Sequence, residues 1–246
     1  MEAAIASAEL RVLPDASAVA GAAAELWAQT AHEAVRSRGV FRVALSGGST
    51  PEGLYALLAQ KRSPQPPWTD TEMFWADERY VPHHHADNNY NRAQHTLMIF
   101  ASIPEHRLHP IRTDSEDAAH AAADYERVMR SAFPEQDWPV LDLALLGLGE
   151  DGHTASLFPK DPALAETRLW VCPAQAPSEP RTRITLTLPV FNHARLAVFL
   201  ICGRSKAGIL KRVLSAAETP PLPAQLIRPA SGRVIFLADR ESAYGL

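Results

Sequence analysis

Short apolar runs alternate with longer segments of helical periodicity along most of this chain. Apolar runs of about four to eight residues between turn signals are typical of buried strands, and longer periodic segments are typical of helices. The expected strands are 40–45, 72–76, 141–146, 183–188, 195–202 and 233–237. The expected helices are 16–38, a helix that begins at 50–51, 88–97, 114–133 and a last one from 205 to about 217.

The ends of two helices carry clear signals. Asp15 is a good N-cap for the Ala-rich helix at 16–38, and Gly39 follows its last residue, where glycine often ends a helix. Pro51 is expected at the first position of the next helix, because a missing N–H does no harm there. Pro-rich stretches at 63–67 and 220–223 are expected to be loops.

Strands that alternate with helices predict an α/β fold with a mostly parallel central sheet flanked by helices. The sequence has no internal repeat, low-complexity tail or linker, so residues 1–246 are expected to form a single domain. Three of the expected strands end in polar turns, with the sequences SGGST, DER and GLGEDGH. Ligands bind beyond the carboxyl ends of the strands in open α/β sheets, so all three turns are expected to face one cleft.

Composition narrows the classes of partner. Hydrophobic residues make up 46% and charged residues 21% of the chain, as is ordinary for a globular protein. The net charge of −4 argues against nucleic acid or an anionic membrane as the main partner. Any site for an anion must therefore be built locally, from loop amides and a few cations.

The two cysteines, Cys172 and Cys202, fit a reducing compartment and suit small buried apolar positions. The N-terminus lacks the basic start and apolar core of a secretory signal. No apolar run approaches the roughly 20 residues that a membrane helix needs. A cytoplasmic protein is therefore expected.

The SGGST turn joins an expected strand to the start of a helix. Two glycines let the backbone approach a ligand closely, and the N–H groups at a helix N-terminus favour an anion. A tight turn with a capped helix is the alternative. The candidate phosphate-binding residues are Ser46, Gly47, Gly48, Ser49 and Thr50.

The GLGEDGHT turn matches two nucleotide-binding patterns without satisfying either. It fits GxGxxG after a strand, but Glu166, at the distance of the ribose-binding acid, does not end a second strand. It also fits a phosphate-binding P-loop frame, but His153 stands where the lysine belongs. Both nucleotide interpretations are therefore disfavoured.

His153 itself is a candidate general base. Histidine has an unperturbed pKa of about 6.5, so a neutral imidazole that can take a proton from water is abundant near neutral pH. Asp151 lies two residues earlier in the same turn. The alternative is a histidine that only caps the turn or faces solvent.

Further charged candidates lie at other ends of expected strands. Asp77 and Arg79 supply a carboxylate and a guanidinium, and arginine can pair with phosphate or stabilise charge on an oxygen. Lys206 starts the helix after a buried strand, and Arg183 and Arg181 flank another strand start. Each of these could instead be an exposed basic residue or part of a surface salt bridge.

Other catalytic classes find little support in the sequence. His83, His84 and His85 are consecutive and complete no standard metal-ligand spacing with Asp87, and neither HExxH nor paired CxxC motifs occur. A GxSxG nucleophile elbow is also missing. Neither a metal nor an organic cofactor is expected.

Taken together, the motifs resemble the 6-phosphogluconolactonase family. The matching stretches are VALSGGSTP, FWADERYVP followed by HADNNYNRA, LDLALLGLGEDGHTASLFP, RITLTLPVFN, FLICGRSKAGIL, PLPAQLIRP and GRVIFLAD. They cover most of the chain in the expected order, and the first forty residues contribute little. The resemblance implies a modified Rossmann-type fold of the phosphosugar isomerase group, which includes glucosamine-6-phosphate deaminases.

The resemblance also implies a reaction and a set of roles. The expected reaction is hydrolysis of 6-phospho-D-glucono-1,5-lactone to 6-phosphogluconate, in the oxidative pentose phosphate pathway, by a monomer or small homo-oligomer. His153 would be the general base, with Asp77 and Arg79 in the active site. Asp77 or Asp151 is expected to orient the imidazole or a water. The 46–50 loop, Arg183 and Lys206 would bind the phosphosugar.

Small departures and two alternatives remain open. The loop with three histidines is more basic than expected, and Asn88 stands where a serine is common before Asn89. A glucosamine-6-phosphate deaminase or isomerase would carry a glutamate soon after the GH turn, in a motif resembling GHIAFNEP. This chain has GHTASLFP there, without that acid. A sugar-phosphate sensor without catalytic activity would be expected to have lost the base.

Overall fold

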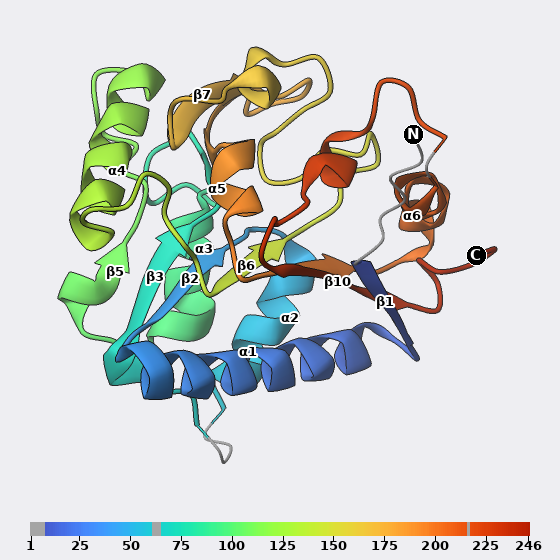
Figure 1. Cartoon of the computed structure of the whole chain (residues 1–246), viewed down its shortest axis with the longest axis horizontal. Coiled ribbons are helices and arrows are strands. Elements are labelled where there is room, and N and C mark those ends of the chain that lie inside the picture. Colours follow the sequence, from blue (N-terminus) through green and yellow to red (C-terminus); the bar gives the residue numbers. More distant parts are fainter. Residues whose placement is uncertain (1–7, 61–64, 216) are drawn as a thin grey trace.

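A seven-stranded parallel sheet forms the centre of the protein (Figure 1). The computed structural model describes residues 8–60, 65–215 and 217–246. The strand order is β1-β10-β9-β6-β2-β3-β5, and every neighbouring pair is parallel. In that order the strands are β1 (Ala8–Leu13), β10 (Arg233–Asp239), β9 (Leu196–Ile201), β6 (Leu143–Leu146), β2 (Phe41–Leu45), β3 (Thr71–Trp75) and β5 (Leu108–His109). The expected α/β fold with a mostly parallel central sheet is confirmed.

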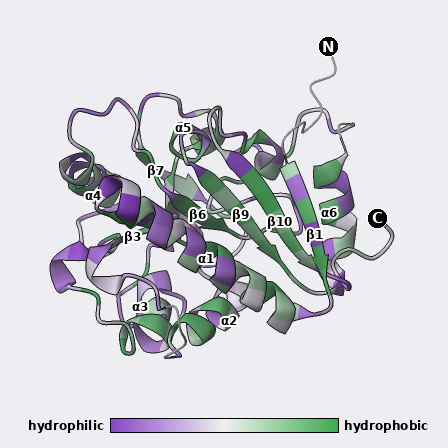
Figure 2. Cartoon of the chain, turned by 60° about the horizontal axis from the view of Figure 1, so that its bottom comes forward, coloured by the Kyte–Doolittle hydropathy of each residue, from purple (hydrophilic) through white to green (hydrophobic). Residues whose placement is uncertain are grey.

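The longest helix, α1 (Ala16–Arg38), crosses one face of this sheet and contacts β2, β9 and β10 (Figure 2). Its ends match the predicted signals. Asp15 Oδ1 accepts a hydrogen bond from the Ala18 N–H at 2.9 Å, and Gly39 adopts φ +76° and donates its N–H to Val35 O. The other helices are α2 (Ser49–Leu58), α3 (Asn89–Ala93), α4 (Ala118–Ala132), α5 (Leu188–Asn192) and α6 (Ala207–Leu214).

The central strands are hydrophobic along their length, because both faces of the sheet are covered. All residues of β6 and β9 are buried, and their ribbons have the hydrophobic colour in Figure 2. The buried side chains form one continuous core cluster, which includes Trp27, Trp75 and Trp170. Within the part of the chain that the structure describes, no helix is long and apolar enough to cross a membrane.

The DER segment is not the polar turn that the sequence predicted. It forms strand β4 (Asp77–Arg79) of a second, antiparallel sheet with β8 (Thr182–Leu186) and β7 (Val171–Gln175), in the order β4-β8-β7. The prediction was wrong because β4 is too short to show a strand pattern of its own. Its conformation comes from pairing with β8, which lies far away in the sequence.

Other element boundaries also differ from the predictions. Pro51 is the third residue of α2, because the helix begins at Ser49 with Gly48 as its N-cap. The predicted helix 88–97 is split into α3 and a π-helical turn, Gln94–Met98. The helix predicted at 114–133 begins only at Ala118, after the N-cap Asp117, whose side chain accepts from the His120 N–H.

Two further segments differ in pattern or length. The predicted alternation at 183–188 is absent, since β8 is buried on both faces from its second residue. The last helix ends at Leu214 and is preceded by a 3-10 turn, Arg204–Lys206. The proline-rich segment 63–67 lies partly outside the described residues.

The strand order explains why the predicted polar turns meet. β9, β6, β2 and β3 are consecutive neighbours in the sheet and all run in the same direction. The segments that follow them are therefore side by side at one edge. These segments contain Lys206 after β9, the GLGEDGH turn after β6, the SGGST loop after β2 and Asp77 after β3.

Candidate active site

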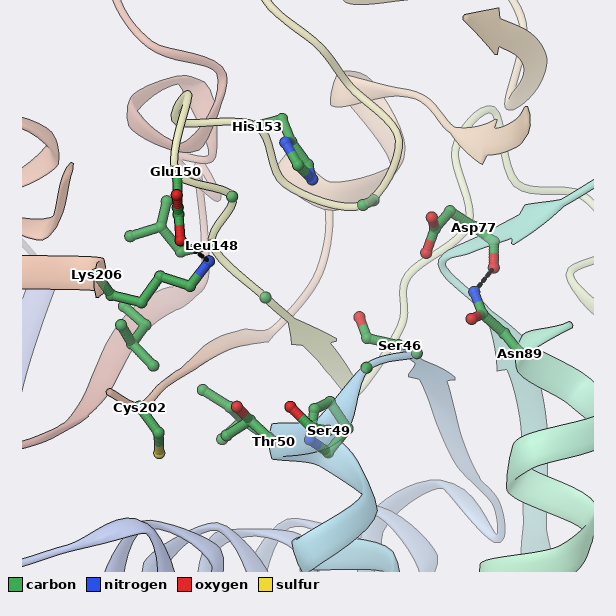
Figure 3. A pocket seen from close by; sticks show the side chains of 18 of the residues that line it. Ser46, Ser49, Thr50, Asp77, Asn89, Leu148, Glu150, His153, Cys202 and Lys206 are labelled. Carbon is green, nitrogen blue, oxygen red and sulfur yellow. Dashed lines mark hydrogen bonds and ion pairs between the residues drawn. The ribbon is translucent and has the colours of Figure 1, made fainter. Parts of the chain in front are cut away.

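A cavity of about 350 Å³ lies where these four segments meet (Figure 3). In Figure 3, Lys206 and Glu150 lie on one side of it, Asp77 and Asn89 on the other, and His153 opposite Ser49 and Thr50. Residues of all three predicted segments line the cavity, so the prediction that they face one cleft is confirmed, although DER is a strand and not a turn. Its lining residues are Ser46, Gly47, Gly48, Ser49, Thr50, Pro51, Asp77, Arg79, Asn89, Gly147, Leu148, Gly149, Glu150, His153, Ala155, Leu200, Ile201, Cys202 and Lys206.

The SGGST loop is held by two hydrogen bonds and by the close approach of Asn89. Ser46 Oγ donates to Leu145 O at 2.6 Å, and Tyr55 Oη donates to Ser46 O at 2.7 Å. A Cβ at Gly47 would lie 1.8 Å from Asn89 Oδ1, so only glycine fits beside that side chain. The Ser46 hydroxyl therefore donates its hydrogen to a backbone carbonyl and not to a ligand. The first N–H groups of α2 have no partners within the helix and lie at the cavity.

The neighbouring residue Gly48 serves a different purpose. It adopts φ +105°, a conformation that L-residues with a side chain rarely adopt, and it is the N-cap of α2. This backbone conformation turns the chain directly from β2 into α2. It places the helix N-terminus, where the partial positive charge of the helix is concentrated, at the wall of the cavity.

His153 has one ring nitrogen bound and one at the cavity. Its Nδ1 lies 2.5 Å from Asp151 Oδ1, and its backbone N–H donates to the same oxygen at 3.0 Å. Burial alone would raise the pKa of Asp151, but the hydrogen bonds from the His153 ring and backbone outweigh it and lower that pKa below its usual value. Asp151 is thus the acid that orients His153, and Nε2 is left for a water or a ligand.

The imidazole of His153 is also confined from both sides. The ring of Phe158 packs against it with 4.6 Å between ring centroids. Gly149 lies under it, and a Cβ at Gly149 would come within 2.1 Å of His153 Nδ1. The turn therefore sets the position of the ring by packing as well as by hydrogen bonding.

Asp77 is buried at the opposite wall and is joined to two other turns. Ser156 Oγ donates to Asp77 Oδ2 at 2.6 Å, and Asn89 Nδ2 donates to the Asp77 backbone carbonyl at 2.9 Å. Asn89 in turn touches Gly47. One carboxylate oxygen of Asp77 is thus fixed by Ser156, and Asp77 has no contact with the His153 ring among the described residues.

Arg79 and Arg183 form a cross-strand pair between β4 and β8. Directly opposed residues point to the same face of a sheet, so both guanidiniums lie on the side of Asp77. Arg79 Nη1 donates to Asp87 O at 2.8 Å, but the Nε atoms of both arginines are buried without a partner among the described residues. Burial, with Arg79 nearby, lowers the pKa of Arg183. Arg79 lines the cavity, whereas Arg183 is not among the described lining residues.

Lys206 and Cys202 come from the segment after β9. Lys206 Nζ lies 4.0 Å from Glu150 Oε1 across the rim of the cavity. Burial raises the pKa of the Cys202 thiol to about 11, so the thiol is protonated near neutral pH and is a poor nucleophile. Among the described lining residues, Lys206 is the cation on the side of the cavity that also carries Glu150.

Four residues that shape the site were not predicted from the sequence: Glu78, Asn89, Glu150 and Ser156. The buried Glu78 carboxylate accepts the backbone N–H groups of Arg79, Asn89 and Tyr90, which fixes the chain after β4. Three of them lie within motifs already described: Glu78 in DER, Glu150 in GLGEDGH and Ser156 in GHTASLFP. No local sequence signal distinguishes them from their neighbours. Their roles depend on contacts with distant segments.

The loop with three histidines does not form a cluster of metal ligands. The His83 ring packs against Tyr90, and His85 Nδ1 accepts the Asp87 backbone N–H. Among the residues that the structure describes, no group of three or more His, Cys, Asp and Glu side chains could hold a metal ion.

Comparisons with known proteins point in one direction. The family described as glucosamine-6-phosphate isomerases/6-phosphogluconolactonase matches residues 14–236. The chain is 38% identical over 217 residues to a 6-phosphogluconolactonase of Synechocystis, covering 87% of this chain and 88% of that protein. It is 39% identical over 213 residues to the human 6-phosphogluconolactonase, covering 84% and 81%. The solved structure of a 6-phosphogluconolactonase from Trypanosoma cruzi has a TM-score of 0.85 at 30% identity, covering 97% of this chain and 96% of that one.

Proposed function

The chain belongs to the glucosamine-6-phosphate isomerase/6-phosphogluconolactonase family, and we propose from this that it hydrolyses 6-phospho-D-glucono-1,5-lactone to 6-phospho-D-gluconate. This reaction belongs to the oxidative pentose phosphate pathway. One observation carries the proposal above the others. A histidine oriented by an aspartate faces a cavity whose far wall is a helix N-terminus beside a lysine. A general base and a candidate anion site thus line the same cavity.

The phosphate group binds at the N-terminus of α2 and at Lys206. The N–H groups of Ser49 and Thr50 and their hydroxyls lie at this wall, and Lys206 adds a full positive charge. A helix N-terminus and a cation together favour an anion over a neutral group. This anchor leaves the lactone ring to extend towards His153 and Asp77.

His153 acts as the general base. Asp151 accepts the hydrogen on Nδ1, which leaves the lone pair of Nε2 directed at a water molecule. The base removes a proton as the water oxygen attacks the lactone carbonyl carbon. Asp151 then stabilises the imidazolium, and the carboxylate of Asp77 orients the attacking water.

Arg79 stabilises the oxyanion that forms on the carbonyl oxygen. Its guanidinium lines the cavity on the side of Asp77, and charge stabilisation by a preorganised donor is strong in a partly enclosed site. Arg183 adds positive potential from the neighbouring strand β8, where it is the cross-strand partner of Arg79. When the ring C–O bond breaks, the protonated His153 returns its proton to the departing ring oxygen.

A deaminase or isomerase reaction is not favoured by the site. Phe158 occupies the stretch after the GH turn where the deaminase motif carries its acid, and its ring packs against His153. An acid beside this histidine, for proton transfer at a carbon, is therefore missing at that position. The presence of the oriented base likewise does not favour a sensor without catalysis.

The test is a lactone-hydrolysis assay with substrate generated in place. The wild-type chain should accelerate decay over spontaneous hydrolysis, and His153→Asn should lose about 10²–10⁴-fold of that acceleration. His32→Asn, an exposed position on α1, is the matched control and should keep full activity. Absence of acceleration by the wild-type chain would refute the proposal. Release of ammonia from glucosamine 6-phosphate would show a deaminase reaction instead.

We place this activity in the cytoplasm, in accordance with the presence of only two cysteines in the sequence. A monomer or small homo-oligomer stays a prediction. The location of the protein in fractionated cells and its mass in solution test these two points.

A further inference from the structure

The cavity carries almost no net charge, although its proposed ligand is an anion. Two lining residues are cationic, Arg79 and Lys206, and two are acidic, Asp77 and Glu150. Asp77 is buried and bound by Ser156. The Glu150 side chain is not held in this way. It forms no hydrogen bond with another described residue, and it is 67% exposed.

The carboxylate of Glu150 lies next to Lys206, the cation that is proposed to bind the phosphate. Its Oε1 lies 4.0 Å from Lys206 Nζ, and Figure 3 shows the two side chains meeting at the rim of the cavity. The lysine is the less exposed partner, with 26% of its side chain accessible. A phosphate that approaches Lys206 therefore meets a carboxylate already in place.

The reaction itself makes this carboxylate important. Hydrolysis adds the oxygen of water to the carbonyl carbon and breaks the ring ester bond, so that a neutral ester becomes a carboxylate and one proton is released. The product thus has one more negative charge than the substrate, in a cavity of the same size. A fixed negative charge at the rim repels the product more strongly than the substrate.

We propose that Glu150 competes with the ligand's phosphate for Lys206 and so lowers the affinity of this end of the cavity for anions. It thereby favours release of the more highly charged product. The inference rests on the proposed lactone hydrolysis for its substrate, but the competition for Lys206 concerns any phosphate.

Glu150→Gln is the direct test, because glutamine keeps the size of the side chain and removes its charge. A partly exposed ion pair contributes up to about 1 kcal/mol, which corresponds to about two- to five-fold in affinity. Inorganic phosphate, measured by calorimetry at low ionic strength, should bind about two- to five-fold more tightly to the variant. The KM for the lactone should fall by a similar factor, and the inhibition constant of 6-phosphogluconate should fall at least as much.

Two controls isolate the mechanism. Glu105→Gln makes the same change in net charge at an exposed position outside the cavity and should alter neither constant. In a Lys206→Met background, Glu150→Gln should change phosphate affinity much less, because the cation for which it competes has been removed.

The outcomes separate this inference from the proposed function. If Glu150→Gln binds phosphate no more tightly, or tightens it equally in the Lys206→Met background, the competition does not exist. A loss of kcat without tighter binding would make Glu150 a structural part of the turn instead and would equally overturn the inference. If the wild-type chain hydrolyses no lactone, the proposed function fails, while the phosphate measurement still decides the role of Glu150.

Discussion

The Ser156 hydroxyl donates a 2.6 Å hydrogen bond to Asp77 Oδ2, with both side chains buried. This contact joins the turn after β6 to the short strand β4, which belongs to the second sheet. It also fixes one oxygen of Asp77. Among the described lining residues, Asp77 is the acid that lies across the cavity from Glu150. The two sheets are thus coupled at the point where the proposed chemistry takes place.

Ser156→Ala should therefore reduce both stability and activity. Removing the donor leaves a buried carboxylate oxygen unsatisfied, which costs about 1–3 kcal/mol of unfolding free energy. Urea unfolding measures the loss of stability, and kcat measures the effect of a misplaced Asp77. Ser131→Ala, which removes a hydroxyl on the exposed face of α4, is the control and should change neither quantity noticeably. Wild-type kcat in Ser156→Ala would show that Asp77 needs no such support.

Gly149→Ala should displace the imidazole of His153. The new Cβ would come within 2.1 Å of Nδ1, so the ring must move away from Asp151. A displacement of about 1 Å at a catalytic group costs on the order of 100-fold in rate, so kcat should fall by about this factor while phosphate affinity changes little. Gly21→Ala is the control, since a Cβ there meets nothing and alanine favours a helix. An unchanged kcat in Gly149→Ala would contradict the packing argument.

Asp151→Asn should disable the base while preserving the shape of the site. The asparagine amide can donate its N–H to His153 Nδ1, which then requires the ring proton on Nε2 and leaves no lone pair facing the water. We expect kcat to fall by about 100-fold or more, with KM little changed. Steady-state kinetics measures both constants. If KM alone changed, Asp151 would act in binding and the tautomer argument would be wrong.

The same carboxylate should contribute to stability in a defined direction of pH. The pKa of Asp151 is lower in the folded protein than the 3.8 of an unperturbed aspartate, so the folded state binds fewer protons than the unfolded state. Its stabilising contribution is therefore present above pH 3.8 and is lost as the pH falls through the folded value. Unfolding free energies of wild type and Asp151→Asn should differ at neutral pH and converge in acid. A constant difference across this range would contradict the assignment.

Lys206→Ala should mainly weaken substrate binding. A hydrogen bond to a charged group contributes about 1.5–3 kcal/mol, which corresponds to an increase in KM of about 10- to 100-fold. kcat should change much less, because the lysine contacts the phosphate rather than the reacting carbonyl. Lys211→Ala, on the exposed face of α6, is the matched control and should leave KM unchanged. A fall in kcat at constant KM would place Lys206 at the reacting end instead.

Local signals in the sequence predicted much of the fold. The N-cap Asp15 and the terminal Gly39 marked both ends of α1, because capping depends on residues next to the helix. Apolar runs between polar turns predicted the central strands, since strands covered on both faces are hydrophobic throughout. Strand β1 went unnoticed because its residues are half-buried or exposed, and β4 because three residues carry no periodic signal.

The candidate site divides in the same way. The SGGST loop, Asp151 and His153 could be found from sequence, because each lies in a strand-to-helix or strand-to-loop turn with a local chemical signal. The sequence left open whether Asp77 or Asp151 orients the imidazole. Only the distance of 2.5 Å between His153 Nδ1 and Asp151 Oδ1 distinguishes them.

What the sequence by itself determined is a set of local structures: the buried central strands, both ends of α1, and the segments after the strands that carry polar groups. The tertiary structure decided which of these groups meet, as in the pairs Asp77–Ser156, Arg79–Arg183 and Glu150–Lys206. The physical reason is that hydrophobic periodicity and turn chemistry depend on a few neighbouring residues. Contacts between distant segments depend on strand order and on packing of the whole core, which no short stretch of sequence encodes.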